Sequence, residues 1–152
     1  MEFFEIKIKR ITHEGDDEKV LKEAYLVEAC SYTEAETRFA QFMAKLHAED
    51  AYTVLKISAT KFSQLAREEG VETEDPFFKV KILSYYKKEG SERLRHHTLV
   101  ALIHAKTPMA AAAEADRIGD EQSAEGHDVV RIEKTRLVAV VIPQRKADAS
   151  VE

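Results

Sequence analysis

Two stretches of the chain alternate between apolar and polar positions. The first lies within residues 3–9 and places apolar side chains at its even positions, Phe4, Ile6 and Ile8. The second lies within residues 77–82 and does the same with Phe78, Val80 and Ile82. Successive side chains of a strand point to opposite faces, so a period of two predicts strands with one buried face and one solvent-exposed face.

The two alternating stretches belong to an internal repeat. Phe3–Ile8 matches Phe77–Ile82 at an offset of 74, with four identities in six positions. Residues 27–31 then align with 103–107, and residues 53–62 align with 128–137. The offset changes within the repeat, and such changes belong in hairpin loops. Polar, glycine-containing stretches at residues 13–18 and 87–92 are therefore interpreted as equivalent hairpin loops.

Each repeat is predicted to contain one helix after its second strand. Residues 31–50 open with Ser31-Tyr32-Thr33-Glu34, and the overlapping Thr33-Glu34-Ala35-Glu36 has the same capping-box spacing. Residues 107–125 open with Thr107-Pro108, a capping hydroxyl followed by proline at the first helical position. The expected buried stripes are Ala35, Phe39, Phe42, Met43 and Leu46 in the first helix and Ala111, Ala115 and Ile118 in the second. The alanines should bring the second helix closer to its sheet, and Gly119 is expected to shorten it.

These elements predict an α+β fold of two tandem strand-strand-helix-strand units. The expected boundaries are residues 1–65 for the first unit, 66–76 for an acidic linker, 77–143 for the second unit and 144–152 for a flexible tail. In each unit the third strand should lie antiparallel beside the first, giving a mainly antiparallel three-stranded sheet covered by one helix. Residues 137–142 are apolar without alternation, which favours close packing of the units as a pseudo-twofold body.

The run Tyr25-Leu26-Val27-Glu28-Ala29, followed by Ser31-Tyr32-Thr33-Glu34-Ala35-Glu36, resembles an uncharacterised bacterial and phage family, domain of unknown function 4494. The spaced Phe4, Lys7 and Lys9 of the opening strand belong to the same resemblance, which spans most of the chain. The family brings no assigned activity, cofactor or catalytic residue. The resemblance implies an accessory or host-interaction role in phages or mobile elements.

The sequence offers little catalytic chemistry. Cys30 is the one cysteine, so an internal disulfide is excluded, and it is interpreted as a small apolar residue of a strand. The six histidines have no chelating spacing, and the five glycines form no phosphate loop. We therefore expect no enzyme activity, no metal site and no cofactor. The longest apolar run is six residues and the N-terminal residues are mixed in charge, so we expect a cytoplasmic protein without a membrane span.

Charge is segregated along the chain. The net charge is −5, yet the predicted first and third strands carry twelve Lys/Arg against four Asp/Glu. By alternation, one set of residues should share the face opposite the helices: Lys7, Lys9, Lys56, Lys79, Lys81 and Arg131, together with Phe3 and Phe77. Cations and exposed rings are what single-stranded nucleic-acid binders use. The same lysines would also keep a sheet soluble and discourage edge pairing.

The expected function is that of a non-enzymatic binding or accessory protein that engages another protein, whose identity the sequence does not give. One alternative is a nucleic-acid-binding module that uses the basic strand face. A second alternative is a self-assembling structural protein, a homo-oligomer formed through equivalent edges of the two units.

Overall fold

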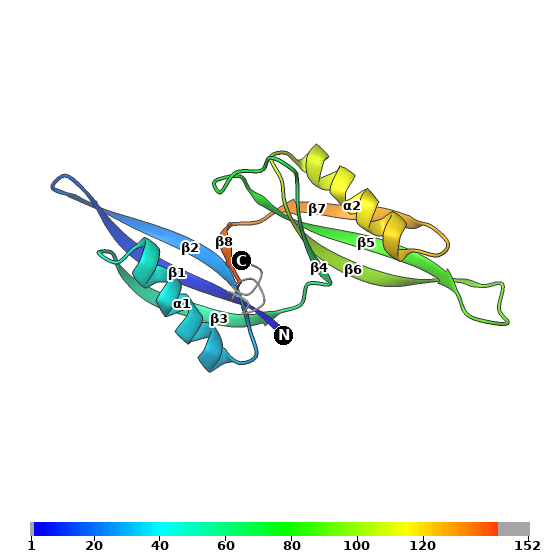
Figure 1. Cartoon of the computed structure of the whole chain (residues 1–152), viewed down its shortest axis with the longest axis horizontal. Coiled ribbons are helices and arrows are strands. Elements are labelled where there is room, and N and C mark those ends of the chain that lie inside the picture. Colours follow the sequence, from blue (N-terminus) through cyan, green and yellow to red (C-terminus); the bar gives the residue numbers. More distant parts are fainter. Residues whose placement is uncertain (1, 143–152) are drawn as a thin grey trace, which may run out of the picture. The chain divides into compact units, whose positions relative to one another are not determined.

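The computed structural model describes residues 2–142, which form two helices and two four-stranded sheets (Figure 1). The predicted α+β class and the two repeated units are confirmed. The tail predicted at residues 144–152 lies outside the described residues. In chain order the elements are β1 (Glu2–Glu14), β2 (Asp17–Ala29), α1 (Tyr32–Leu46), β3 (Ala51–Thr60), β4 (Gln64–Arg67), β5 (Phe77–Lys87), β6 (Leu94–His104), α2 (Pro108–Gln122), β7 (His127–Lys134) and β8 (Leu137–Val141).

The first compact unit holds the residues up to Thr60 and those from Leu137 onward. Its strand order is β3-β1-β2-β8, and β1 pairs antiparallel with both β2 and β3, as predicted. Helix α1 crosses one face of this sheet (Figure 1). The core beneath it joins Phe4, Ile6 and Ile8 of β1 to apolar residues of β2 and α1: Tyr25, Val27, Ala29, Ala35, Phe39 and Met43. The alternation seen in the sequence therefore identifies the buried face correctly.

The second unit, Lys61–Arg136, repeats this plan with the strand order β4-β6-β5-β7. Phe78, Val80 and Ile82 of β5 are buried against α2, where the facing residues are Ala111, Ala115 and Ile118. The small alanines let the backbone of α2 lie close to β5, β6 and β7. The backbone of α1, spaced from its sheet by larger side chains, approaches chiefly β2 and β8. The second helix is thus the closer one, as expected.

Both helices begin at the predicted caps. The Oγ of Ser31 accepts from the amide of Glu34 at 3.1 Å, so of the two overlapping capping boxes the earlier one is used. The Oγ1 of Thr107 accepts from the amide of Ala110 at 3.1 Å, and Pro108 follows at the first helical position. These bonds satisfy amides that have no partner inside the helix.

Some details differ from the sequence predictions. The first hairpin loop is only Gly15 and Asp16, because cross-strand pairing continues out to Glu14 and Asp17. The exposed Leu46 is the last residue of α1, so the buried stripe ends one turn earlier, at Met43. Cys30 is exposed rather than buried, because β2 ends at Ala29 and the chain then turns into the cap of α1.

Gly119 does not shorten the second helix. It is buried inside α2, which continues to Gln122. A Cβ atom at Gly119 would lie 2.3 Å from Cγ of His127, closer than any real contact. The glycine is therefore needed to make room for the imidazole ring of His127, which lies against the helix at this point.

Each sheet also gains a fourth strand, where the repeat alone predicted three. β4 pairs parallel with β6, and β8 pairs parallel with β2. β4 closes the first repeat but joins the sheet of the second unit, and β8 closes the second repeat but joins the sheet of the first. The two exchanged strands, β4 and β8, pair with their neighbours in the same register, because Ala66 lies opposite Ile103 and the equivalent Val141 lies opposite Val27. Residues 66 and 67, at the start of the predicted linker, belong to β4.

Candidate functional site

The residues of the predicted basic face form one group in each unit. Phe4, Ile6 and Ile8 face α1, so the intervening lysines of β1 lie on the opposite, helix-free face of the sheet. The side chains of Lys7, Lys9, Lys56, Lys79, Lys81 and Arg131 are all exposed. The structure thus brings Lys7, Lys9 and Lys56 together on the first sheet, and the other three on the second.

Within each group two cations lie directly opposite one another across neighbouring strands. Lys7 of β1 faces Lys56 of β3, and Lys81 of β5 faces Arg131 of β7. Like charges in this position destabilise a sheet. Nearby carboxylates offset part of the repulsion, because Lys7 Nζ lies 3.6 Å from Glu5 and Arg131 pairs with Glu133. Each repeat therefore contains a directly opposed pair of cations, although such a pair is unfavourable for the stability of the sheet.

The two phenylalanines do not form an exposed aromatic surface. Phe77 is buried, and its ring stacks on His104 with ring centroids 4.1 Å apart. Phe3 is half-buried. Binding of any ligand by the basic face stays a prediction. Because Phe77 is buried, other side chains would have to stack on the bases of a nucleic acid.

Each edge strand next to a cation pair contains a β-bulge. The register of β1 with β3 shifts between Lys7 and Ile8, which leaves Leu55 without a partner. The register of β5 with β7 shifts between Lys81 and Ile82, which leaves Val130 unpaired in the same way. Both bulged residues expose about half of their side chains, 53% for Leu55 and 49% for Val130. Bulges re-aim side chains at sheet edges and next to functional sites.

A groove of about 430 Å³ opens between α1 and β3 of the first unit, and we call it the α1–β3 groove. Its volume lies within the range of ligand sites in proteins. The residues that line it come from three elements of this unit: Ile6 of β1, Glu36, Thr37, Phe39 and Ala40 of α1, and Tyr52, Val54 and Ile57 of β3. Six of these eight side chains are apolar or aromatic, so the groove suits an apolar side chain of a ligand.

At the equivalent place of the second unit, polar side chains bridge the helix and the edge strand. Repeat alignment equates Ala40 with Asp116 and Tyr52 with His127. Nε2 of His127 lies 3.0 Å from Oδ1 of Asp116, and its Nδ1 lies 3.5 Å from Oδ1 of Asp120. These contacts bind β7 to α2, with the ring seated over Gly119. In the first unit, alanine and tyrosine at these places form no such polar bridge, and the ring of Tyr52 instead contacts Phe39 of α1 with ring centroids 5.6 Å apart.

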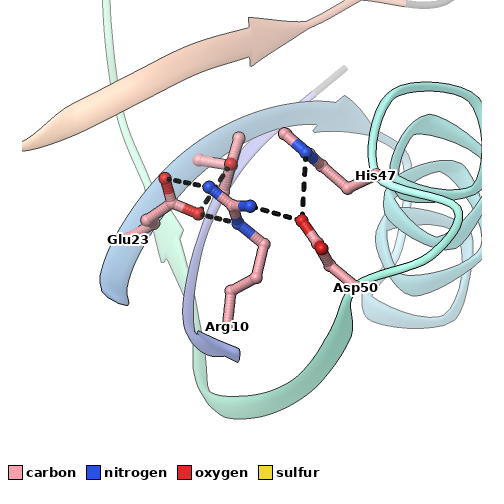
Figure 2. A network of polar contacts seen from close by, with 5 residues as sticks. Arg10, Glu23, His47 and Asp50 are labelled. Carbon is pink, nitrogen blue, oxygen red and sulfur yellow. Dashed lines mark hydrogen bonds and ion pairs between the residues drawn. The ribbon is translucent and has the colours of Figure 1, made fainter. Parts of the chain in front are cut away.

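A third feature is a polar cluster of the first unit, beside the C-terminal end of α1 (Figure 2). Arg10 Nε donates to Glu23 Oε1 at 2.7 Å, and Arg10 Nη1 donates to Asp50 Oδ2 at 2.5 Å. Tyr25 donates to the same Glu23 oxygen at 3.2 Å, and His47 Nδ1 lies 3.6 Å from Asp50. The hydrogen bond that Arg10 donates to Glu23 is the largest cause that raises the pKa of Arg10 above its ordinary value. Every charge here is paired within the cluster. The cluster therefore links β1 to β2 and to Asp50, the residue directly before β3.

The cluster predicts a measurable pH effect at Tyr25. Burial raises the pKa of its hydroxyl above the ordinary value, with a further contribution from the Glu23 carboxylate. A folded pKa above the unfolded one stabilises the fold fully below about pH 10, and this contribution is lost as the pH rises through the folded pKa. At about pH 11, where unfolded tyrosines are mostly ionised, Tyr25 should stay protonated in the folded protein.

Ultraviolet titration of tyrosinate checks this expectation. At that pH, Tyr25→Phe should leave the tyrosinate absorbance of the folded protein unchanged and should lower the absorbance of the urea-unfolded protein by the signal of one tyrosine. An equal loss from folded and unfolded Tyr25→Phe protein would contradict the raised pKa.

No residue cluster of the described chain has the composition of a metal site: within residues 2–142 no three His, Cys, Asp or Glu side chains lie close enough to hold an ion. No helix among these residues is long and apolar enough to cross a membrane.

Sequence reasoning missed the groove, the bulges and the polar cluster, although two of them left a signal. Val54 and Ile57 are spaced by three positions instead of two, and the second repeat has the same spacing in Val129 and Ile132. Such a break in the alternation marks a bulge. Arg10 continues the even-numbered buried series of β1, so a charge on that face requires a buried partner. The groove had no such signal, because it depends on how far α1 stands from β3.

Comparison with known proteins gives one match. The family model described as Domain of unknown function (DUF4494) matches residues 2–144. No curated protein and no solved structure matches the chain significantly.

Proposed function

The chain belongs to the family Domain of unknown function (DUF4494), and we propose that this member is a non-enzymatic binding or accessory protein that engages another protein through the α1–β3 groove. The observation that supports this is the contrast between the two units. In the second unit the side chain of His127 bridges the edge strand to the helix through Asp116 and Asp120, whereas the first unit has an apolar groove at the equivalent place.

The groove suits an apolar anchor residue of a partner protein. Val54 is 41% exposed at its edge, and the half-buried Tyr52 and Ile57 supply aromatic and apolar contact area beside it. Anchor residues that fill such pockets carry much of the binding energy of protein interfaces. An accessory role in phages or mobile elements and a cytoplasmic location, both expected from the sequence, are parts of the same proposal.

Selection from a random peptide library displayed on phage, with the full chain as bait, tests this function. Enriched peptides should contain an apolar anchor, and Val54→Asp should weaken their binding at least tenfold by placing a charge at the groove edge. Val20→Asp is the matched control, because Val20 has similar exposure and does not line the groove. Circular dichroism of both variants checks the fold. Peptides that bind wild type and Val54→Asp equally, or the absence of any enriched peptide, would contradict the proposal.

A second candidate function is the binding of single-stranded nucleic acid by the basic face. The opposed pairs Lys7 with Lys56 and Lys81 with Arg131 favour it, because two adjacent cations suit a phosphate. Binding of single-stranded DNA should then weaken with salt and be lost in the double variant Lys7→Glu, Lys81→Glu. No binding at low salt would exclude this candidate. Self-assembly stays a prediction from the sequence.

A further inference from the structure

Strand β3 is the point where the groove and the cation pair meet. It lies at the end of the strand order, so among residues 2–142 β1 is its only neighbour in the sheet, and one row of its backbone amides and carbonyls faces away from β1. Its side chains alternate between the two faces. Tyr52, Val54 and Ile57 line the groove, whereas Lys56 lies on the helix-free face beside Lys7.

Lys56 lacks an acidic partner within the described part of the chain. Lys7 lies near Glu5, and Arg131, the equivalent of Lys56 in the second unit, pairs with Glu133. No carboxylate among residues 2–142 forms an ion pair with Lys56. The residue directly opposite Lys56 across the strands is Lys7, a like charge, which raises the free energy of the sheet.

We propose that the partner of the α1–β3 groove is an extended peptide segment that adds to β3 as a further strand and alternates apolar with acidic residues. This inference rests on the proposed function. Because strand side chains alternate, a segment paired with β3 places every second residue in the groove and the residues between them beside Lys56. The groove selects apolar side chains, and the unpartnered cation selects carboxylates.

The bulge sets the length of the added strand. Leu55 interrupts the regular backbone of β3, so a segment that pairs regularly beside Lys56 is confined to the stretch that follows the bulge, residues 56–60. Five residues of strand extend about 17 Å. The segment that fits is therefore short, about five residues, with its groove-facing position beside Ile57. Leu55 itself offers an additional apolar contact.

The equivalent strand of the second unit provides an internal control. β7 is also an edge strand with a bulge. Its cation, Arg131, is paired with Glu133, and the side chain of His127 bridges β7 to α2. We expect no segment to add there. The same arrangement of helix and edge strand should therefore bind a segment in the first unit and not in the second. This predicts a single binding site in each chain.

Fluorescence anisotropy with the full chain and short synthetic peptides tests the inference. The probes are a nine-residue peptide that alternates valine and glutamate, the same peptide with lysine for glutamate, a valine–glutamate peptide with scrambled order, and the alternating peptide N-methylated at every second amide. The alternating acidic peptide should bind about fivefold more tightly than the lysine peptide, the size expected when one exposed ion pair replaces a repulsion. Scrambling or N-methylation should remove binding.

Variants separate the inference from the proposed function. Lys56→Glu should reverse the preference to the lysine peptide, Arg131→Glu should leave it unchanged, and Val54→Asp should abolish binding of both. Equal binding of acidic and basic peptides with loss in Val54→Asp would overturn the inference and leave the proposed function standing. Failure of all peptides, including those from the library selection, would overturn both. Binding of a single-stranded oligonucleotide that needs Lys56 but not Val54 would assign this face to nucleic acid and overturn the inference.

Discussion

Replacing Arg10 by methionine should lower the free energy of unfolding by about 3–5 kcal/mol, the range measured when one member of a buried ion pair is removed. Arg10 is only 9% exposed, and its guanidinium binds two carboxylates, those of Glu23 and Asp50, that are themselves mostly shielded from solvent. The shorter apolar side chain would leave both carboxylates without a cation. Urea-induced unfolding followed by circular dichroism measures the change.

The double variant Arg10→Met, Glu23→Leu should recover part of this loss, because it removes one of the two carboxylates that Arg10→Met leaves without a cation, whereas Asp50 remains. Arg117→Met is the matched control: Arg117 also binds two carboxylates, those of Glu114 and Glu121, but its side chain is half exposed. Exposed pairs contribute little, so the control should lose much less stability than Arg10→Met. A similar loss at Arg10 and Arg117 would show that the shielding of the Arg10 cluster has no energetic effect.

The same cluster shows what the sequence could and could not reveal. Alternation identified which face of β1 is buried, since Phe4, Ile6 and Ile8 all lie in the core. It placed Arg10 on that face as well, but the partners come from β2 and from the start of β3, at sequence separations of 13 and 40. Periodicity describes one strand at a time, so it cannot identify which distant carboxylates will meet a buried cation.

The candidate site shows a second limit. The sequence located the cations Lys7 and Lys56 on one face, and the structure places them opposite each other. The groove on the other side of β3 depends on side-chain volumes. Phe39 and Met43 hold α1 away from its sheet, whereas Ala115 and Gly119 in the same positions let α2 close over β7. The repeat predicted a difference in distance, but only the packed structure shows that the difference opens a groove.

Cutting the backbone between β4 and β5 should leave the two halves of the chain bound to one another. A protease site inserted between Thr73 and Glu74, in the exposed turn after β4, would produce one fragment ending in β4 and another ending in β8. Each fragment then contributes the outer strand of a sheet built by the other, because β4 pairs with β6 and β8 pairs with β2. After cleavage the fragments should elute together in native size exclusion and separate in urea.

Strand variants show whether the exchange holds the fragments together. Val141→Asp and Ala66→Asp occupy equivalent positions in β8 and β4, where each wild-type side chain packs against a core. A buried unpaired carboxylate is unfavourable by several kcal/mol, so the double variant should release the fragments after cleavage. Val138→Asp, at an exposed position of β8, is the control and should not. Fragments of the wild type that separate without denaturant, or fragments of the double variant that stay together, would contradict a role for the exchange.

The cut also has a thermodynamic consequence. In the intact chain both exchanged strands belong to the same polypeptide as the sheets they complete, so their pairing is intramolecular and independent of concentration. After cleavage the same pairing becomes an association of two chains, and the urea midpoint should rise with protein concentration. The uncut protein should show no such dependence. A midpoint that is independent of concentration after cleavage would mean that each sheet is stable with three strands, and that β4 and β8 contribute little to the fold.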